Sequence, residues 1–127
     1  MILSTVADES FKEFVLDQLA ALPELRVKAM FGGHGLYQAD RFFGIIAAGR
    51  LYFKTDERSR SFYLDRDMEP FSYEKARRII SMAYFEVPAD VLERRDELVA
   101  WAQRAIQAAT SDATKLRAKS KQRRKPR

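Results

Sequence analysis

Alternating apolar and polar residues predict a strand-rich region between positions 27 and 54. Aromatic and β-branched residues dominate this region, which is typical of strands. We interpret it as one long strand bent at Gly32-Gly33, followed by two shorter strands at 42–46 and 51–53. Glycine has no Cβ and therefore permits a bulge or a sharp bend. The predicted turns lie at 39–41 and 48–50.

A second hairpin is predicted between positions 71 and 87, with a charged turn at 74–78. Its second arm, 79–87, is apolar on both faces. Such a strand is central in its sheet or faces a partner subunit. We therefore predict a dimer or partner surface on one face of this arm, formed by Ile80, Met82 and Tyr84. The opposite face carries Ile79, Ala83, Phe85 and Val87.

Apolar residues at spacings of three and four predict the helices. The first is capped by Asp8 and ends at Pro23. A short second helix at 57–64 is capped by Thr55 or Asp56 and points Phe62 and Tyr63 inward. A helical turn follows at 89–92, and Asp96 caps the last helix. The apolar stripe of that helix is Leu98, Trp101, Ala102, Ala105, Ile106 and Ala109.

This order of elements predicts an α+β domain of the form α-β(3)-α-β(2)-α. Turns of hairpin length make the sheet antiparallel, with the helices covering it. We place one domain at 1–111 and a basic C-terminal tail, partly disordered, at 112–127. The length of 127 residues suits a single domain of this kind.

The formal net charge of +5 is unevenly distributed. Residues 112–127 hold eight Lys or Arg and one acid, Asp112, which gives +7. The first 111 residues hold 15 basic and 17 acidic side chains, which gives −2. The surface of the domain therefore offers little support for nucleic-acid binding.

Two interpretations of the tail stay open. It extends the last helix by a turn or two from Thr114, and its like charges and Pro126 favour disorder at its end. It acts either as a solubilising terminus or as a weakly specific arm that binds nucleic acid through phosphates. The candidate nucleic-acid-binding residues are Lys115, Arg117, Lys119, Lys121, Arg123, Arg124, Lys125 and Arg127.

The glycine-rich run at 32–35 is interpreted as a structural bend at Gly32 and Gly33. A phosphate-binding loop requires a helix after the glycines, and here a strand follows. His34 is the only histidine and the chain has no cysteine, so neither a ligand cluster nor a nucleophile–base pair is recognisable. We predict no catalytic residue, no cofactor and no metal, and we disfavour an enzyme with a site around 32–37.

The aromatic residues of the first strands allow two interpretations. They are Tyr37, Phe42, Phe43, Tyr52 and Phe53. A stacking platform for single-stranded nucleic acid needs basic residues among its rings, and only Arg41, Arg50 and Lys54 lie nearby in sequence. We therefore favour a role for these rings in the core.

The sequence predicts a cytoplasmic protein that does not interact with membranes. No apolar run approaches the ~20 residues of a membrane span. The first 15 residues carry acids where a signal peptide carries bases. The absence of cysteine is compatible with a reducing compartment.

Several short sequence motifs, in a consistent order, resemble those of the TfoX N-terminal domain family, which is named for the competence regulator TfoX/Sxy. They are MFGGHGLY at 30–37, LYFKTD at 51–56, EPF at 69–71 and SMAYFEVP at 81–88. The resemblance implies a fold similar to the secretion-chaperone-like class and a regulatory, non-enzymatic role. It further implies action with the transcription machinery, in concert with cyclic-AMP receptor protein, on DNA-uptake genes. The full-length regulator has a second, helical domain where this sequence has the basic tail.

Two functional hypotheses follow. The first is a non-catalytic interaction module in transcriptional regulation, expected to form a homodimer and to contact a protein of the transcription machinery. The alternative is a weakly specific nucleic-acid binder that acts through the tail.

Overall fold

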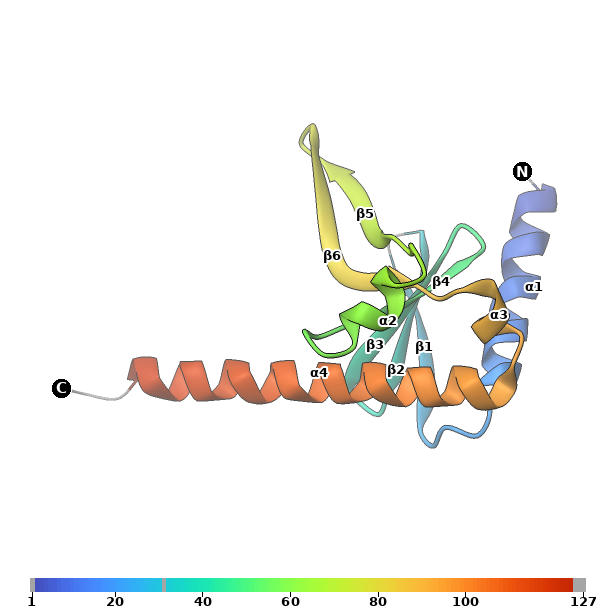
Figure 1. Ribbon diagram of the computed structural model, residues 1–127. Helices are drawn as coiled ribbons and strands as arrows, with labels where there is room; N and C mark the ends of the chain where they lie inside the picture. The colour runs from blue at the N-terminus through green and yellow to red at the C-terminus, as the bar shows by residue number, and fades with distance from the viewer. Residues whose placement is uncertain (1, 31, 125–127) are drawn as a thin grey trace.

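The computed structural model of the chain describes the backbone at residues 2–30 and 32–124. It describes the side chains at residues 9–30, 32–73, 76–79 and 82–111. Within these ranges the chain forms one six-stranded antiparallel sheet and four helices (Figure 1). The elements in chain order are α1 (Ile2–Gln18), β1 (Leu25–Met30), β2 (Gly33–Gln38), β3 (Arg41–Ala47), β4 (Arg50–Lys54), α2 (Arg60–Leu64), β5 (Pro70–Lys75), β6 (Arg78–Glu86), α3 (Ala89–Leu92) and α4 (Arg95–Arg124).

The strands lie in the order β1-β2-β3-β4-β6-β5, and every neighbouring pair is antiparallel. The α+β class with an antiparallel sheet is therefore confirmed. The hairpins that turn at Ala39-Asp40 and Ala48-Gly49 lie where the sequence predicts them. Strand β6 is not fully central, because only its last residues, 84–86, pair with β4.

The predicted long strand with a bend at Gly32-Gly33 is wrong. It is two strands, β1 and β2, that pair as a hairpin in which Met30 lies opposite Gly33. Four strands instead of three therefore precede α2 in the described part of the chain. Gly32 adopts φ +74°, a left-handed conformation that glycine takes without steric cost and that allows the chain to reverse.

Helices α1, α2 and α4 start at other positions than predicted, and α4 begins at Arg95, so Asp96 lies in its first turn and does not cap it. Helix α1 begins at Ile2, so Asp8 lies inside it and does not cap it. Helix α2 is limited to 60–64, although Asp56 still caps the turn that leads into it. The prediction for α2 is right for Tyr63, which is buried, and wrong for Phe62, whose side chain is 43% exposed. The turn α3 matches its predicted range.

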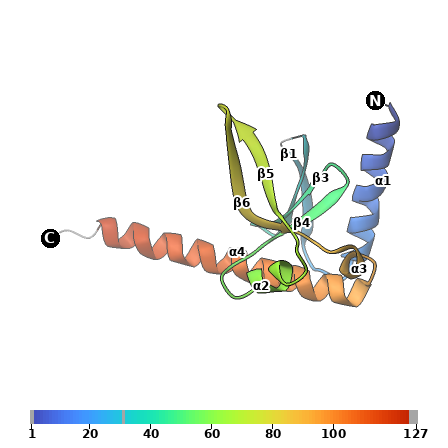
Figure 2. The same ribbon diagram turned by 45° about the horizontal axis from the view of Figure 1, so that its top comes forward.

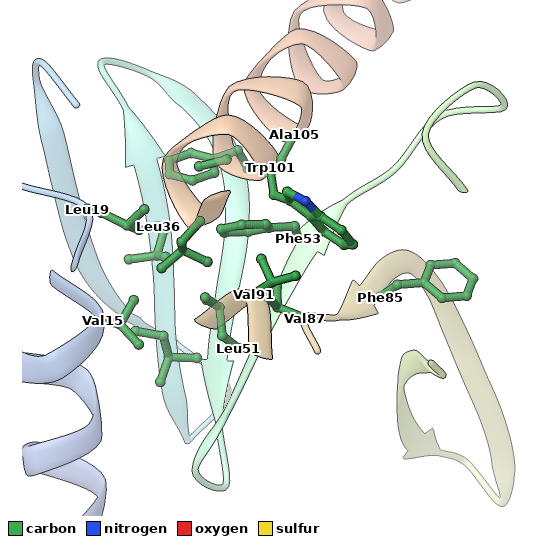
Figure 3. Close-up of a cluster of buried hydrophobic side chains, with 14 of the residues drawn as sticks. Val15, Leu19, Leu36, Leu51, Phe53, Phe85, Val87, Val91, Trp101 and Ala105 are labelled. Carbon is green, nitrogen blue, oxygen red and sulfur yellow. The ribbon is translucent and has the colours of Figure 1, made fainter. Parts of the chain in front are cut away.

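The hydrophobic core lies between one face of the sheet and the helices (Figure 3). Leu36 and Phe53 project from the sheet into this core and are fully buried. Each helix contributes to it: Val15 from α1, Tyr63 from α2 and Val91 from α3. The residues from α4 are Leu98, Trp101, Ala102 and Ala105.

Helix α4 crosses β3 and β4 and then continues beyond the rest of the domain (Figures 1 and 2). Its last described buried residue is Ala108, and its backbone stays helical to Arg124. The helix therefore extends further than the expected turn or two past Thr114. The domain boundary at 111/112 stays a prediction, and residues 125–127 lie outside the described chain. None of the described helices is both long and apolar enough to cross a membrane.

Candidate interaction surface on the open face of the sheet

The face of the sheet opposite the core carries a second set of apolar side chains. Directly paired residues of neighbouring strands project to the same face. Leu36, Gly44 and Phe53 are paired in this way on the core face, and Ile45 and Tyr52 are paired on the other. We call this second face the open face, because the core residues of all the described helices lie on the opposite side. On β2 to β6 its apolar and aromatic members include Tyr37, Phe42, Ile45, Tyr52, Phe71, Tyr73, Met82 and Tyr84, with Lys54 beside them.

One row of rings crosses the open face from β2 to β6. Tyr37 stacks on Phe42 with ring centroids 5.1 Å apart and planes inclined by 28°, and Phe42 lies 5.1 Å from the ring of Tyr84. The Tyr84 hydroxyl donates a hydrogen bond to the Phe42 carbonyl oxygen at 3.2 Å. The Lys54 ammonium lies 5.3 Å from the Tyr84 ring and closes this end of the row. Each ring pair contributes about 0.5–1.5 kcal/mol beyond its buried area.

A second row of rings occupies the β4–β5 side of the open face. Tyr52 meets Phe71 edge to face at 5.1 Å, and Phe71 lies 6.2 Å from Tyr73. Tyr73 is 39% exposed. Burial raises the pKa of the Tyr52 hydroxyl, and the nearby Glu86 carboxylate adds to the increase. The rings of this row are uncharged, and the exposed part of the row presents mainly apolar surface to solvent.

The expectation that all five aromatic residues of the first strands lie in the core is only partly right. Phe43 and Phe53 are fully buried core residues. Tyr37, Phe42 and Tyr52 lie on the open face and are half-buried. Successive residues of a strand project to opposite faces, and a β-bulge between the pairs made by Leu36 and Tyr37 decides which one faces the core: Phe42 pairs with Tyr37 on the open face, and Phe43 lies in the core.

The three residues predicted as a dimer or partner surface differ in their accessibility. Met82 is half-buried, and Tyr84 is 5% exposed because its ring lies in the first row. The side chain of Ile80 lies outside the described residues. The surface predicted from sequence does not include Tyr52, Phe71 and Tyr73. The pattern that could have indicated them is alternation with buried neighbours, as for Tyr52 beside Phe53.

The glycine-rich hairpin shows a structural role for both of its predicted glycines. A Cβ at position 33 would collide with the backbone of Ile46, so glycine is required there by close approach. The adjacent hollow, which His34 helps to line, has a volume of about 30 Å³. No group of three or more His, Cys, Asp or Glu that could hold a metal ion occurs among the described residues.

Six of the eight candidate nucleic-acid-binding residues of the tail lie on the last turns of α4. Those from Lys115 to Arg124 belong to its helical backbone, and their side chains lie outside the description. Lys125 and Arg127 lie beyond the described chain. The part of this basic segment up to Arg124 therefore lies on a helical extension of the domain, and no other described helix or strand lies alongside it (Figure 1).

No curated protein matches the chain. The family model described as TfoX N-terminal domain matches residues 17–109, which are 93 of the 127 residues. This match extends from the end of α1 through the whole sheet to the part of α4 that packs on it. The chain therefore belongs to the TfoX N-terminal domain family.

Proposed function

We propose that the protein is a non-catalytic regulatory module that acts in transcription by binding a protein partner through the open face of its sheet. The supporting observation is the one-sided packing of the described helices, none of which covers the two rows of rings. Apolar ring surface of this kind, rimmed by polar groups, is typical of protein interfaces. Membership of the TfoX N-terminal domain family supports the regulatory role.

The first partner that we propose is a second copy of the chain. Tyr73 is the exposed end of the second row on β5, where it is 39% exposed, and Met82 lies on the same face of the neighbouring strand β6. A two-fold pairing of these patches would bury the rings of Phe71 and Tyr52 from solvent. Such an interface is isologous, because the same patch lies on both subunits.

Light scattering coupled to size exclusion tests the dimer. The wild type should elute with the mass of two chains at micromolar concentration, and a Tyr73→Arg/Met82→Lys variant should elute as a monomer. Phe14→Ser is the matched control, since Phe14 is a 40% exposed apolar residue of α1, away from the open face. A monomeric wild type, or a dimer that survives the double substitution, would refute this assembly.

The contact with the transcription machinery needs a separate test. Tagged wild type and the Tyr73→Arg/Met82→Lys variant are incubated with purified RNA polymerase and with cell extract, both treated with nuclease. Retention of polymerase by the wild type alone is the expected result. Equal retention by both proteins, or none by either, contradicts a role of this face in binding the polymerase.

A second function is supported by the basic segment at the end of α4. The eight basic side chains within 112–127 attract phosphates, and counterion release makes such binding dependent on salt. Replacing all eight with Gln should abolish binding to duplex DNA in anisotropy measurements. In the wild type, the logarithm of the affinity should fall with the logarithm of salt concentration by about 0.9 per neutralised phosphate. Unchanged binding by the substituted chain would exclude the segment as the contact.

A further inference from the structure

A groove lies at the β1–β2 end of the open face, beside the first row of rings. It has a volume of about 410 Å³ and is lined by Arg26, Val27, Lys28, Tyr37, Ala39 and Asp40. This volume falls in the range of small-molecule sites, about 300–1,000 Å³. The groove is open to solvent and combines a ring with two cationic side chains.

The strand register shows how the ring of Tyr37 is placed. Across the sheet, Arg26 of β1 pairs with Tyr37 of β2, and Tyr37 pairs with Phe42 of β3. One face of the Tyr37 ring stacks on Phe42, so its other face is directed toward β1. At the far end of the row, Lys54 closes the stack over Tyr84, whereas the Tyr37 end adjoins the groove. A planar ring that entered the groove would become the next member of the stack.

The charges around the groove favour a polyanion. Arg26 and Lys28 both lie on the open side of the edge strand β1 and are exposed, while Val27 between them packs against the core. None of the ion pairs found among the described side chains involves either cation. Two residues along a strand separate their Cα atoms by about 6.8 Å. The two cations can therefore contact different charged groups of one extended ligand.

Asp40 adds an acceptor at the turn end of the groove. A carboxylate there repels phosphate but accepts hydrogen bonds from an amino group. Cytosine and adenine carry exocyclic amino groups, whereas thymine does not. The groove thus combines a stacking surface, flanking cations and one acceptor, which are the groups that recognise an unpaired base in its strand.

We infer that this groove binds single-stranded nucleic acid, with one base stacked on Tyr37 and neighbouring phosphates held by Arg26 and Lys28. The inference does not depend on the dimer or on the basic segment, because residues 26–42 alone carry it. It also changes the interpretation of the aromatic residues made from sequence. The cations that a stacking platform needs, Arg26 and Lys28, come from β1. This strand precedes the rings in sequence and reaches them only through the hairpin at Gly32.

Fluorescence anisotropy with a labelled single-stranded oligodeoxycytidine tests the site in the full chain. Tyr37→Ala should weaken binding about 5- to 150-fold, which corresponds to the 1–3 kcal/mol of one stacked base. Tyr37→Phe should bind within twofold of wild type. Arg26→Gln/Lys28→Gln should reduce the salt slope by about 1.4, since each phosphate of a single strand contributes about 0.7. Phe14→Ala, which removes a 40% exposed ring of α1 away from the open face, is the matched control and should bind as wild type does.

Three comparisons separate this site from other sources of binding. Replacing the eight basic residues of 112–127 with Gln should leave the effect of Tyr37→Ala intact. Oligodeoxythymidine should bind more weakly than oligodeoxycytidine, and Asp40→Ala should remove that difference. Polyglutamate should not displace the oligonucleotide.

The exposed pair Arg26→Gln/Lys28→Gln keeps the inference testable if Tyr37→Ala fails to fold, because neither side chain contributes to the core. The inference is overturned if the wild type does not bind the single strand. It is also overturned if neither the Tyr37 nor the β1 variants weaken binding, or if polyglutamate competes fully, which would indicate a simple anion site.

Discussion

Gly33 lies directly against the backbone of Ile46, and a side chain at position 33 would overlap the Ile46 carbonyl oxygen. The two residues belong to neighbouring hairpins, and backbone atoms cannot move aside as a flexible side chain can. We expect Gly33→Ala to lower the free energy of unfolding by about 1–3 kcal/mol, the usual cost of overpacking. Urea denaturation followed by circular dichroism measures this change.

The neighbouring glycine provides the control for this prediction. Among the described residues other than its chain neighbours, no atom lies within 4 Å of the Cβ that a substitution at Gly32 would add, so its φ of +74° is the constraint there. Asn tolerates left-handed φ better than most residues. Gly32→Asn should therefore change stability by less than Gly33→Ala. The reverse order would show that the turn, not the approach to Ile46, limits this hairpin.

The hydrogen bond from Tyr84 to Phe42 joins β6 to β3 across the open face. Tyr84→Phe removes the hydroxyl donor but keeps the ring in its stack. We expect a loss of about 0.5–1.5 kcal/mol in unfolding free energy, the net contribution of one hydrogen bond. Equal stability of Tyr84→Phe and wild type in urea would mean that water replaces the donor without cost. Tyr37→Phe removes a hydroxyl from another ring of the same row and serves as the comparison.

Gln18 connects α1 to α3. Its side chain is 7% exposed, and its Nε2 donates to the Leu92 carbonyl oxygen at 3.1 Å. Gln18→Ala should lower the unfolding free energy by about 1–3 kcal/mol, because a partly buried acceptor loses its partner. Hydrogen exchange should show faster opening of α3 in this variant. Gln103→Ala, an exposed glutamine of α4, should have little effect on either measurement.

The Asp56 cap predicts a dependence of stability on pH. The carboxylate accepts hydrogen bonds from the backbone N–H groups of Ser59 at 2.9 Å and Arg58 at 3.0 Å. The Ser59 bond is the main reason that the pKa of Asp56 is below its ordinary value. A lowered folded-state pKa gives stability that is present above the unfolded-state pKa, about 3.9, and is lost as pH falls through the folded value.

Asp56→Ala should therefore cost about 0.5–2 kcal/mol at pH 7, and the difference from wild type should shrink below pH 4. Thermal unfolding at pH 7 and at acid pH checks this. Glu57→Gln removes a neighbouring exposed charge and leaves the cap in place. A difference between Asp56→Ala and wild type that did not change with pH would assign the effect to packing.

Local chemistry was sufficient to predict most of the hairpins. The turns at 39–40, 48–49 and 76–77 each interrupt a clear alternation, and all three are present. The β1–β2 hairpin was missed because the alternation is compatible with one strand or two, and glycine permits a bend as well as a reversal. Only the pairing of Met30 with Gly33 distinguishes a hairpin from a bent strand. This pairing depends on contacts between strands that the local sequence pattern does not contain.

The open face shows a different limit of sequence reasoning. Alternation places Tyr52 and Phe53 on opposite faces, but it does not state which face the helices cover. Since both faces of β4 and β6 are apolar, the sequence favours the core for Tyr37, Phe42 and Tyr52 as well, and these three lie on the open face. The cations of the groove were missed for the same reason, because Arg26 and Lys28 reach Tyr37 through strand pairing and not through proximity in sequence.

The length of α4 has a mechanical consequence. Its 30 residues span about 45 Å, and the 16 that follow Ala108 account for about 24 Å of this. A helix transmits orientation along its axis, whereas a flexible chain does not. A partner bound to the last turns of α4 would therefore be held at a fixed distance and orientation relative to the sheet, because Leu98 and Trp101 anchor the helix in the core. Inserting two residues after Ser111 would rotate the last turns of α4 by about 200° about the helix axis, at 3.6 residues per turn. The packing of Leu98 and Trp101 in the core would not change.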